Sequence, residues 1–304
     1  MPCCYLSSGS FQTSNLEKII SLSLEYGLNL ELSSSLPFSP LNLDTVYSAR
    51  GRLRFLVHNY FPSPNIPFVL NLASTDPEIH QQSENLCQNA IDLCAKLGAP
   101  FYSVHAGFAL NISPSDLGNP VIQGRLAAGQ SIPRDMAYET FVASVNNLAI
   151  YAATRNVGLL VENNVAARET IADDGTFPLL LVAVEEIRDF FSDIADSTVG
   201  LLLDTGHAKV SAATMGIPPE GYLVELASFI KGLHLSDNNG QRDTNSPFTG
   251  NAWFAPFLKG LASIPMVIEV NNLSLDEMFQ QMDLVEKMIA DHHPLEPETL
   301  CKKI

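Results

Sequence analysis

The chain has 304 residues, and 33 Asp and Glu against 17 Lys and Arg leave a formal net charge of −16. Hydrophobic residues make up 46% of the sequence, which is enough for a sizeable core and excludes general disorder. The acidic balance repels phosphate backbones at long range, so nucleic acid is an unlikely partner.

Short apolar runs alternate with amphipathic stretches along the chain. The predicted strands are residues 4–7, 28–32, 54–59, 100–105, 158–162, 200–204, 232–235 and 266–270. The predicted helices are residues 15–26, 77–97, 134–154, 179–191, 221–229, 252–259 and 275–290. Apolar strands that alternate with helices favour a parallel sheet covered on both faces. Eight strands in this length favour an α/β fold of the (β/α)8 TIM-barrel type, with an open doubly wound sheet as the alternative.

The alternation predicts a single domain over residues 1–290, followed by a C-terminal tail over residues 291–304. Two long connections interrupt it, residues 107–133 after the fourth predicted strand and residues 236–251 after the seventh. Loops of this length in a compact domain are usually lids or binding loops, although the first is also compatible with a peripheral insertion. We therefore expect both connections to border a functional site.

The cysteines indicate a reducing compartment. Cys3, Cys4, Cys87, Cys94 and Cys301 include no CxxC pair, as expected of a reduced, cytoplasmic protein. The sequence has no apolar run of about 18 residues and no basic segment followed by an apolar run. Neither a membrane span nor a signal peptide is therefore predicted, and a homo-oligomer is compatible with the sequence.

Polar side chains stand at the ends of the predicted strands. Carboxylates end three apolar runs and histidines lie at or just beyond the ends of others: Glu162, Asp204, Glu269, His58, His105, His207 and His234. A single such histidine is more often structural than functional. In a barrel, however, these ends converge where active sites are built. Converging buried carboxylates repel one another and need a cation, so the sequence predicts a metal site.

Four segments carry a resemblance to a known family. They read Val-Glu-Asn-Asn at 161–164, Leu-Asp-Thr-Gly-His-Ala at 203–208, His-Leu-Ser-Asp-Asn at 234–238 and Ile-Glu-Val at 268–270. These segments resemble the xylose isomerase-like, endonuclease IV-like TIM barrels. That family includes sugar isomerases, tagatose/psicose-type 3-epimerases and inosose dehydratases.

The resemblance implies one divalent ion, held by Glu162, Asp204, His234 and Glu269. This oxygen-rich ligand set suits Mn²⁺, Mg²⁺ or Co²⁺ at least as well as Zn²⁺. The two glutamates would also move protons, and His207 and Arg242 would contact substrate oxygens. Aromatic residues near the barrel mouth could pack against a sugar; they are Tyr60, Phe61, Phe108, Phe248 and Trp253.

The DNA-repair branch of the family binds three zinc ions, with added histidines that match His58 and His105. It also uses an Asp-x-His pair on the seventh loop, which reads Asp243-Thr244-Asn245 here. An amide oxygen is a weak zinc ligand, so a complete trinuclear site is not expected. His58, His105 and Asp243 remain candidates for a second metal site, and the two histidines also for substrate contacts.

The favoured hypothesis is a divalent-metal-dependent isomerase or epimerase of a sugar, sugar phosphate or related polyol. The metal would polarise a carbonyl, and the two glutamates would move the proton through an enediolate. One alternative is a metal-dependent phosphodiesterase like an apurinic-site endonuclease, which His58 and His105 favour. The other alternative is a non-catalytic barrel.

Overall fold

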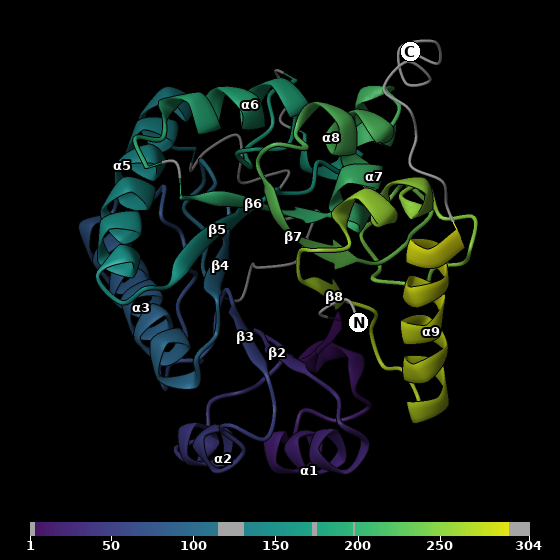
Figure 1. The fold of residues 1–304 in the computed structure, drawn as a ribbon. Helices are drawn as coiled ribbons and strands as arrows, with labels where there is room; N and C mark the ends of the chain where they lie inside the picture. The colour runs from purple at the N-terminus through teal and green to yellow at the C-terminus, as the bar shows by residue number, and fades with distance from the viewer. Residues whose placement is uncertain (1–3, 115–130, 172–174, 197, 292–304) are drawn as a thin grey trace.

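Eight parallel strands close into a barrel in chain order, with helices around them (Figure 1). This computed structural model describes residues 4–114, 131–171, 175–196 and 198–291. The strands are β1 (Cys4–Ser7), β2 (Leu30–Leu32), β3 (Phe55–His58), β4 (Phe101–His105), β5 (Gly158–Glu162), β6 (Gly200–Asp204), β7 (Ile230–Leu235) and β8 (Met266–Ile268). Cys4 is in register with Met266, so the first strand pairs with the last. The predicted (β/α)8 barrel is confirmed.

The α-helices lie between consecutive strands or follow the last one. They are α1 (Leu16–Tyr26), α2 (Asn42–Ser48), α3 (Pro77–Leu97), α5 (Arg134–Ala153), α6 (Val184–Asp193), α7 (Thr205–Met215), α8 (Glu220–Glu225) and α9 (Leu275–Asp291). Short 3₁₀ helices are η1 (Ser8–Ser10), η2 (Arg168–Thr170) and η3 (Ala255–Leu261). Local signals set many boundaries: Asp76 caps the first turn of α3 beside Pro77, and Gly98 ends it at φ 71°.

The structure differs from the sequence predictions at three elements. It contains two helices that were not predicted, α2 and α7, and the helix predicted over residues 252–259 is wrong, because the 3₁₀ helix η3 forms there. The sequence did not predict helix α7 for two reasons. Its first residues, Thr205-Gly206-His207, are weak helix formers, and the helix lies largely buried, so its sequence TGHAKVSAATM has no amphipathic period. Only its first-turn cap, Asp204, marks its start.

Alternation along the strands divides the apolar side chains into two clusters. Residues that point outward from the barrel join the large core beneath the helices, which includes Leu159, Val161, Leu201 and Leu203. The residues between them form a separate cluster inside the barrel: Tyr5, Leu56, Phe101, Leu160, Leu202 and Val267. We call these six residues the lower layer. Strand β7 contributes Gly232 there, where a Cβ would lie 3.0 Å from Cδ1 of Leu202.

Parts of two predicted regions lie outside the described residues. The connection over residues 107–133 is described only up to residue 114 and from residue 131, and the tail is described only at Asp291, where α9 ends. Cys87 and Cys94 are buried free thiols. None of the helices among the described residues is long and apolar enough to cross a membrane.

Candidate metal centre

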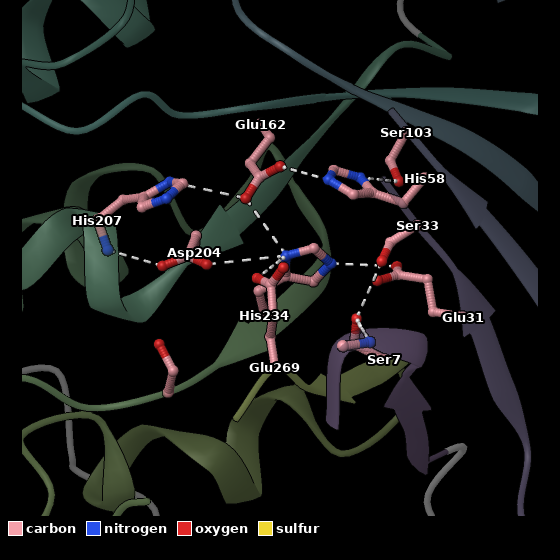
Figure 2. A network of polar contacts seen from close by, with 12 residues as sticks. Ser7, Glu31, Ser33, His58, Ser103, Glu162, Asp204, His207, His234 and Glu269 are labelled. Atoms are coloured by element: carbon pink, nitrogen blue, oxygen red, sulfur yellow. Dashed lines mark hydrogen bonds and ion pairs between the residues drawn. The ribbon is translucent and has the colours of Figure 1, made fainter. Parts of the chain in front are cut away.

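Four strand ends bring the predicted ligand set together inside the barrel. Glu162 ends β5, Asp204 ends β6, His234 lies in β7, and Glu269 follows β8. Asp204 and His234 are Cα partners in neighbouring strands. One ligand atom from each of the four residues lies within 4.8 Å of the others. Nδ1 of His234 is 3.3 Å from Oε1 of Glu162 and 2.8 Å from Oε2 of Glu269 (Figure 2).

The polar atoms of this cluster fit a cation. Both oxygens of Glu162, Oδ2 of Asp204 and Nδ1 of His234 are buried and make no hydrogen bond, although they lie within ion-pair distance of one another. Unpartnered buried oxygens carry a large desolvation penalty. A divalent ion bound among them would satisfy all of these atoms at once, and carboxylate and imidazole ligands suit several divalent metals.

Burial and neighbouring charges shift the pKa values of the three carboxyl groups in different directions. Burial raises the pKa of Asp204 well above its usual value, and the attraction of His207 does not offset it. Burial alone raises the pKa of Glu162 too, but the facing imidazoles of His105 and His234 hold it well below its usual range. Burial likewise opposes the charged form of Glu269, whose pKa His234 nevertheless lowers to about 2. The charged forms of these buried carboxyl groups therefore depend on nearby positive charge.

The two side-chain oxygens of Asp204 have different roles. Oδ1 accepts a 2.7 Å hydrogen bond from the backbone N–H of His207 and so caps α7. Oδ2 is left free and faces the cluster. Asn163 fixes the Asp204 backbone from the neighbouring strand end, because its Oδ1 accepts from the Asp204 N–H at 2.8 Å. In the Leu-Asp-Thr-Gly-His-Ala segment, Asp204 thus points one oxygen at the site and caps helix α7 with the other.

His58 and His105 converge on the second oxygen of Glu162. Nε2 of His58 is 3.2 Å and Nδ1 of His105 is 3.5 Å from Glu162 Oε2. Nδ1 of His58 lies 3.0 Å from the Ser103 hydroxyl. Burial lowers the pKa of His58 to about 3, so its imidazole is neutral at ordinary pH. His58, His105 and Glu162 form a second group with metal-ligand spacing.

The seventh loop approaches the site through His207. Nδ1 of His207 lies 2.9 Å from the carbonyl of Asn163, and its Nε2 lies 3.3 Å from Oδ2 of Asp243. The Asn245 amide lies 2.9 and 3.0 Å from the two Asp243 oxygens and, in its hydrogen-bonding orientation, donates to both. An amide donor therefore engages the Asp243 carboxylate. Asp243 is not part of the group that joins His58 to His105.

Arg242 lies away from the cluster. Its side chain is 70% exposed, and its Nε donates a 2.8 Å hydrogen bond to Glu169 on η2. Arg242 is therefore engaged by Glu169 in this structure, and its contact with substrate stays a prediction.

Sequence reasoning missed Glu31, the central residue of β2. Glu31 is fully buried, and its Oε2 lies 3.1 Å from Nε2 of His234, on the opposite side of the ring from the metal-ligand cluster (Figure 2). A carboxylate that holds the distal nitrogen of a metal-binding histidine fixes its tautomer and ring orientation. The sequence signal is Leu30-Glu31-Leu32, a carboxylate within a short apolar run. Glu31 lies inside this strand and not at its end, where the predicted site residues lie.

A cavity of about 520 Å³ lies beside the cluster, and His105 and His207 are among its lining residues. Of the aromatic residues expected at the barrel mouth, Tyr60 and Phe108 line this cavity. Phe61 and Phe248 are instead buried in the core, and Trp253 packs against that core.

The comparisons with known proteins agree with this architecture. A family model described as a xylose isomerase-like TIM barrel matches residues 37–288. The structure of a D-tagatose 3-epimerase-like protein is 19% identical, with a TM-score of 0.69, over 95% of this chain and 97% of that chain. D-psicose 3-epimerase from Clostridium cellulolyticum, solved with D-tagatose, is 17% identical, with a TM-score of 0.63, over 95% and 98%. A protein from Thermus thermophilus, soaked with ZnCl₂, is 20% identical, with a TM-score of 0.63, over 96% and 99%. At these identities the likenesses establish the fold.

Proposed function

The chain belongs to the xylose isomerase-like TIM-barrel family, and from that premise we propose that it is a divalent-metal-dependent isomerase or epimerase of a sugar or related polyol. The observation that carries the proposal is the convergence of Glu162, Asp204, His234 and Glu269, whose ligand atoms lie together. Those of the first three residues are buried and include atoms without a hydrogen bond, and Glu269 is partly exposed. Mn²⁺, Mg²⁺, Co²⁺ and Zn²⁺ all suit this donor set.

A divalent ion bound here would polarise a substrate carbonyl and acidify the neighbouring C–H. The protein's own part is to move the proton. Glu162 ends β5 and Glu269 follows β8, three strands away in the barrel, so the two carboxylates approach the centre from different strands. One carboxylate would take the proton from carbon, and the other would return it on the opposite face or at the adjacent carbon. His207, which lines the cavity beside the cluster, would contact a substrate oxygen.

Proton transfer can be tested with isotope and conservative variants. Metal-loaded protein incubated with ketoses in deuterium oxide should incorporate solvent deuterium into the product, because the proton passes through an exchangeable carboxylate. Glu162→Gln and Glu269→Gln should each lower turnover by about 10²–10⁴-fold while keeping at least partial metal, since an amide retains an oxygen ligand but cannot act as the base. Conversion without deuterium exchange, or near-native turnover in a variant, would remove that glutamate from the proposed role.

A metal-dependent phosphodiesterase is the second candidate, and one observation favours it. His58 and His105 both face Glu162 Oε2, so that Glu162 could bridge two ions. The Asn245 amide counts against a third ion, because it engages the Asp243 carboxylate. Three equivalents of tightly bound zinc together with cleavage of bis(p-nitrophenyl) phosphate would favour the hydrolase. One equivalent of metal with no cleavage would favour the isomerase.

We also propose that residues 1–290 form one domain and that the protein works in the cytoplasm. The pairing of β1 with β8 supports the first proposal, because it joins the two ends of the chain in one barrel. The free thiols of Cys87 and Cys94 support the second.

A further inference from the structure

The cavity beside the metal-ligand cluster opens onto the candidate chemistry. His105 and His207 both line it, and both lie within 3.6 Å of Glu162 oxygens. Its volume of about 520 Å³ is in the range of small-molecule sites. A substrate part bound there is therefore adjacent to the atoms that would react.

The walls of this cavity are mostly apolar. They are formed by residues that follow β3, β4 and β5, among them Tyr60, Phe68, Leu70, Phe108, Ile112 and Leu179. Besides the two histidines, the polar lining groups are Ser34, Asn59, Asn164 and the hydroxyl of Tyr60, and no Lys or Arg is among the described residues that line the cavity. The described walls therefore offer few partners to hydroxyl groups and neither a lysine nor an arginine to a phosphate.

Buried amides hold these walls in place. Asn71 donates to the carbonyl of Phe108 at 2.9 Å and accepts from its N–H at 3.1 Å, joining the β3 and β4 loops. Nδ2 of Asn164 lies 2.8 Å from the carbonyl of Ala106 and 2.9 Å from that of Leu180. Phe108 also forms a β-bridge with Leu179. The cavity is therefore held by hydrogen bonds between three loops, and a ligand need not organise it.

We propose that the substrate carries an uncharged apolar group, the size of an aromatic ring or a short alkyl chain, attached to the polyol or carbonyl part that reacts at Glu162. This inference rests on the proposed function for the reacting part. An unmodified sugar would bury most of its hydroxyls against carbon with few partners, and a phosphorylated sugar would bury a charge with neither lysine nor arginine among the described wall residues. An apolar substituent removes both penalties and gains from leaving water.

Hydroxamates provide the test, because they chelate divalent metals and can carry a variable tail. Isothermal titration compares acetohydroxamate with phenylacetohydroxamate on the Mn²⁺-loaded protein. The phenyl compound should bind about tenfold or more tightly, because its ring enters the apolar cavity. Equal affinity of the two compounds would overturn the inference while leaving the metal centre intact.

Variants of the cavity test whether the higher affinity of the phenyl compound comes from binding of its ring in the cavity. Ile112 and Leu179 line the cavity and are partly exposed, so Ile112→Asn and Leu179→Asn should fold normally. Each should reduce the preference for the phenyl compound to about twofold or threefold while leaving acetohydroxamate affinity unchanged. Ile217, which is 40% exposed and does not line the cavity, provides the matched control Ile217→Asn. A preference that survives both cavity variants would place the ring elsewhere and overturn the inference.

A probe that needs no metal separates the two proposals. If neither hydroxamate binds, the proposed metal chemistry fails, and p-cresol titrated against the metal-free protein then decides the cavity question. Saturable p-cresol binding that is weakened about tenfold by Leu179→Asn but not by Ile217→Asn would support the apolar site. Absence of saturable binding would overturn it.

Discussion

Two layers of the same barrel interior differ completely in chemistry. The lower layer is Tyr5, Leu56, Phe101, Leu160, Leu202 and Val267. Two residues further along the chain stand Ser7, His58, Ser103, Glu162, Asp204 and Glu269, and in β7 His234 follows Gly232 by the same step. We call these seven residues the upper layer. Two residues advance a strand by about 6.6 Å and return the side chain to the same face.

The comparison shows how stability and chemistry are separated in this barrel. The lower layer buries carbon against carbon, which favours folding. The upper layer buries oxygens of Glu162 and Asp204 and Nδ1 of His234 without hydrogen bonds, which opposes folding unless a cation is bound. The lower layer therefore stabilises the barrel, while the upper layer gives the barrel its candidate site.

Removing a metal ligand should have the largest effect on the upper layer. His234→Ala is expected to abolish tight metal binding and to lower the thermal stability of metal-saturated protein to the level of metal-free protein. A metal at about 1,000 times its Kd contributes about 4 kcal/mol to folding. Elemental analysis and calorimetry would measure both effects. The control His80→Ala changes a histidine that contacts Ser144 outside the barrel interior, and it should keep the metal. Full metal occupancy in His234→Ala would contradict the ligand assignment.

A change in the lower layer should affect stability without affecting the metal. Leu202→Ala leaves a cavity among Leu160, Gly232 and their neighbours and should lower the free energy of unfolding by about 2–5 kcal/mol. The metal affinity of the folded protein should stay unchanged. Denaturant unfolding and metal titration measure the two quantities. Leu41→Ala, at a residue that is 57% exposed, should change stability by no more than about 0.5 kcal/mol. A large loss of metal affinity in Leu202→Ala would show that the layers are coupled.

Replacing Glu31 tests whether this carboxylate orients His234 for metal binding. Glu31→Gln should weaken metal affinity about 10–100-fold, because the amide orients the His234 ring less firmly and makes it a weaker base. Competition with a fluorescent chelator measures the affinity. Glu286 on α9 is exposed, so Glu286→Gln should leave it unchanged. If Glu31→Gln weakens only the stability of the metal-free protein, Glu31 is structural and does not position the ligand.

Among the polar residues around the site, the smallest effect on metal binding is expected at His58 and His105, which contact Glu162 from outside the four-ligand set. His58→Asn and His105→Asn should each lower kcat/KM about tenfold while leaving the core metal in place, because they remove a partner of Glu162 but no ligand. Steady-state kinetics and metal analysis on the same samples provide the comparison. Complete loss of the metal from either variant would show that the ligand set includes that histidine.

Several elements were readable from the sequence because their signals are local. The runs ending at Glu162 and Asp204 show apolar strands with polar last residues, and Asp76-Pro77 and Gly98 mark the two ends of α3. Helix α7 was not readable, because a buried helix lacks the amphipathic period on which the prediction relies. Arg242 was assigned to the substrate by resemblance, and its pairing with Glu169, 73 residues away, is invisible to sequence spacing.

The sequence by itself determined the alternation of strands and helices and the polar residues that end the strands, because each depends on neighbours within a few positions. The tertiary structure decided which of these residues meet. Glu31 and His234 are 203 residues apart, and only barrel closure brings them into contact. The apolar cavity likewise combines residues that follow five strands, β2 to β6, and its shape depends on how those segments pack. Local propensity specifies elements, whereas long-range register and packing specify a site.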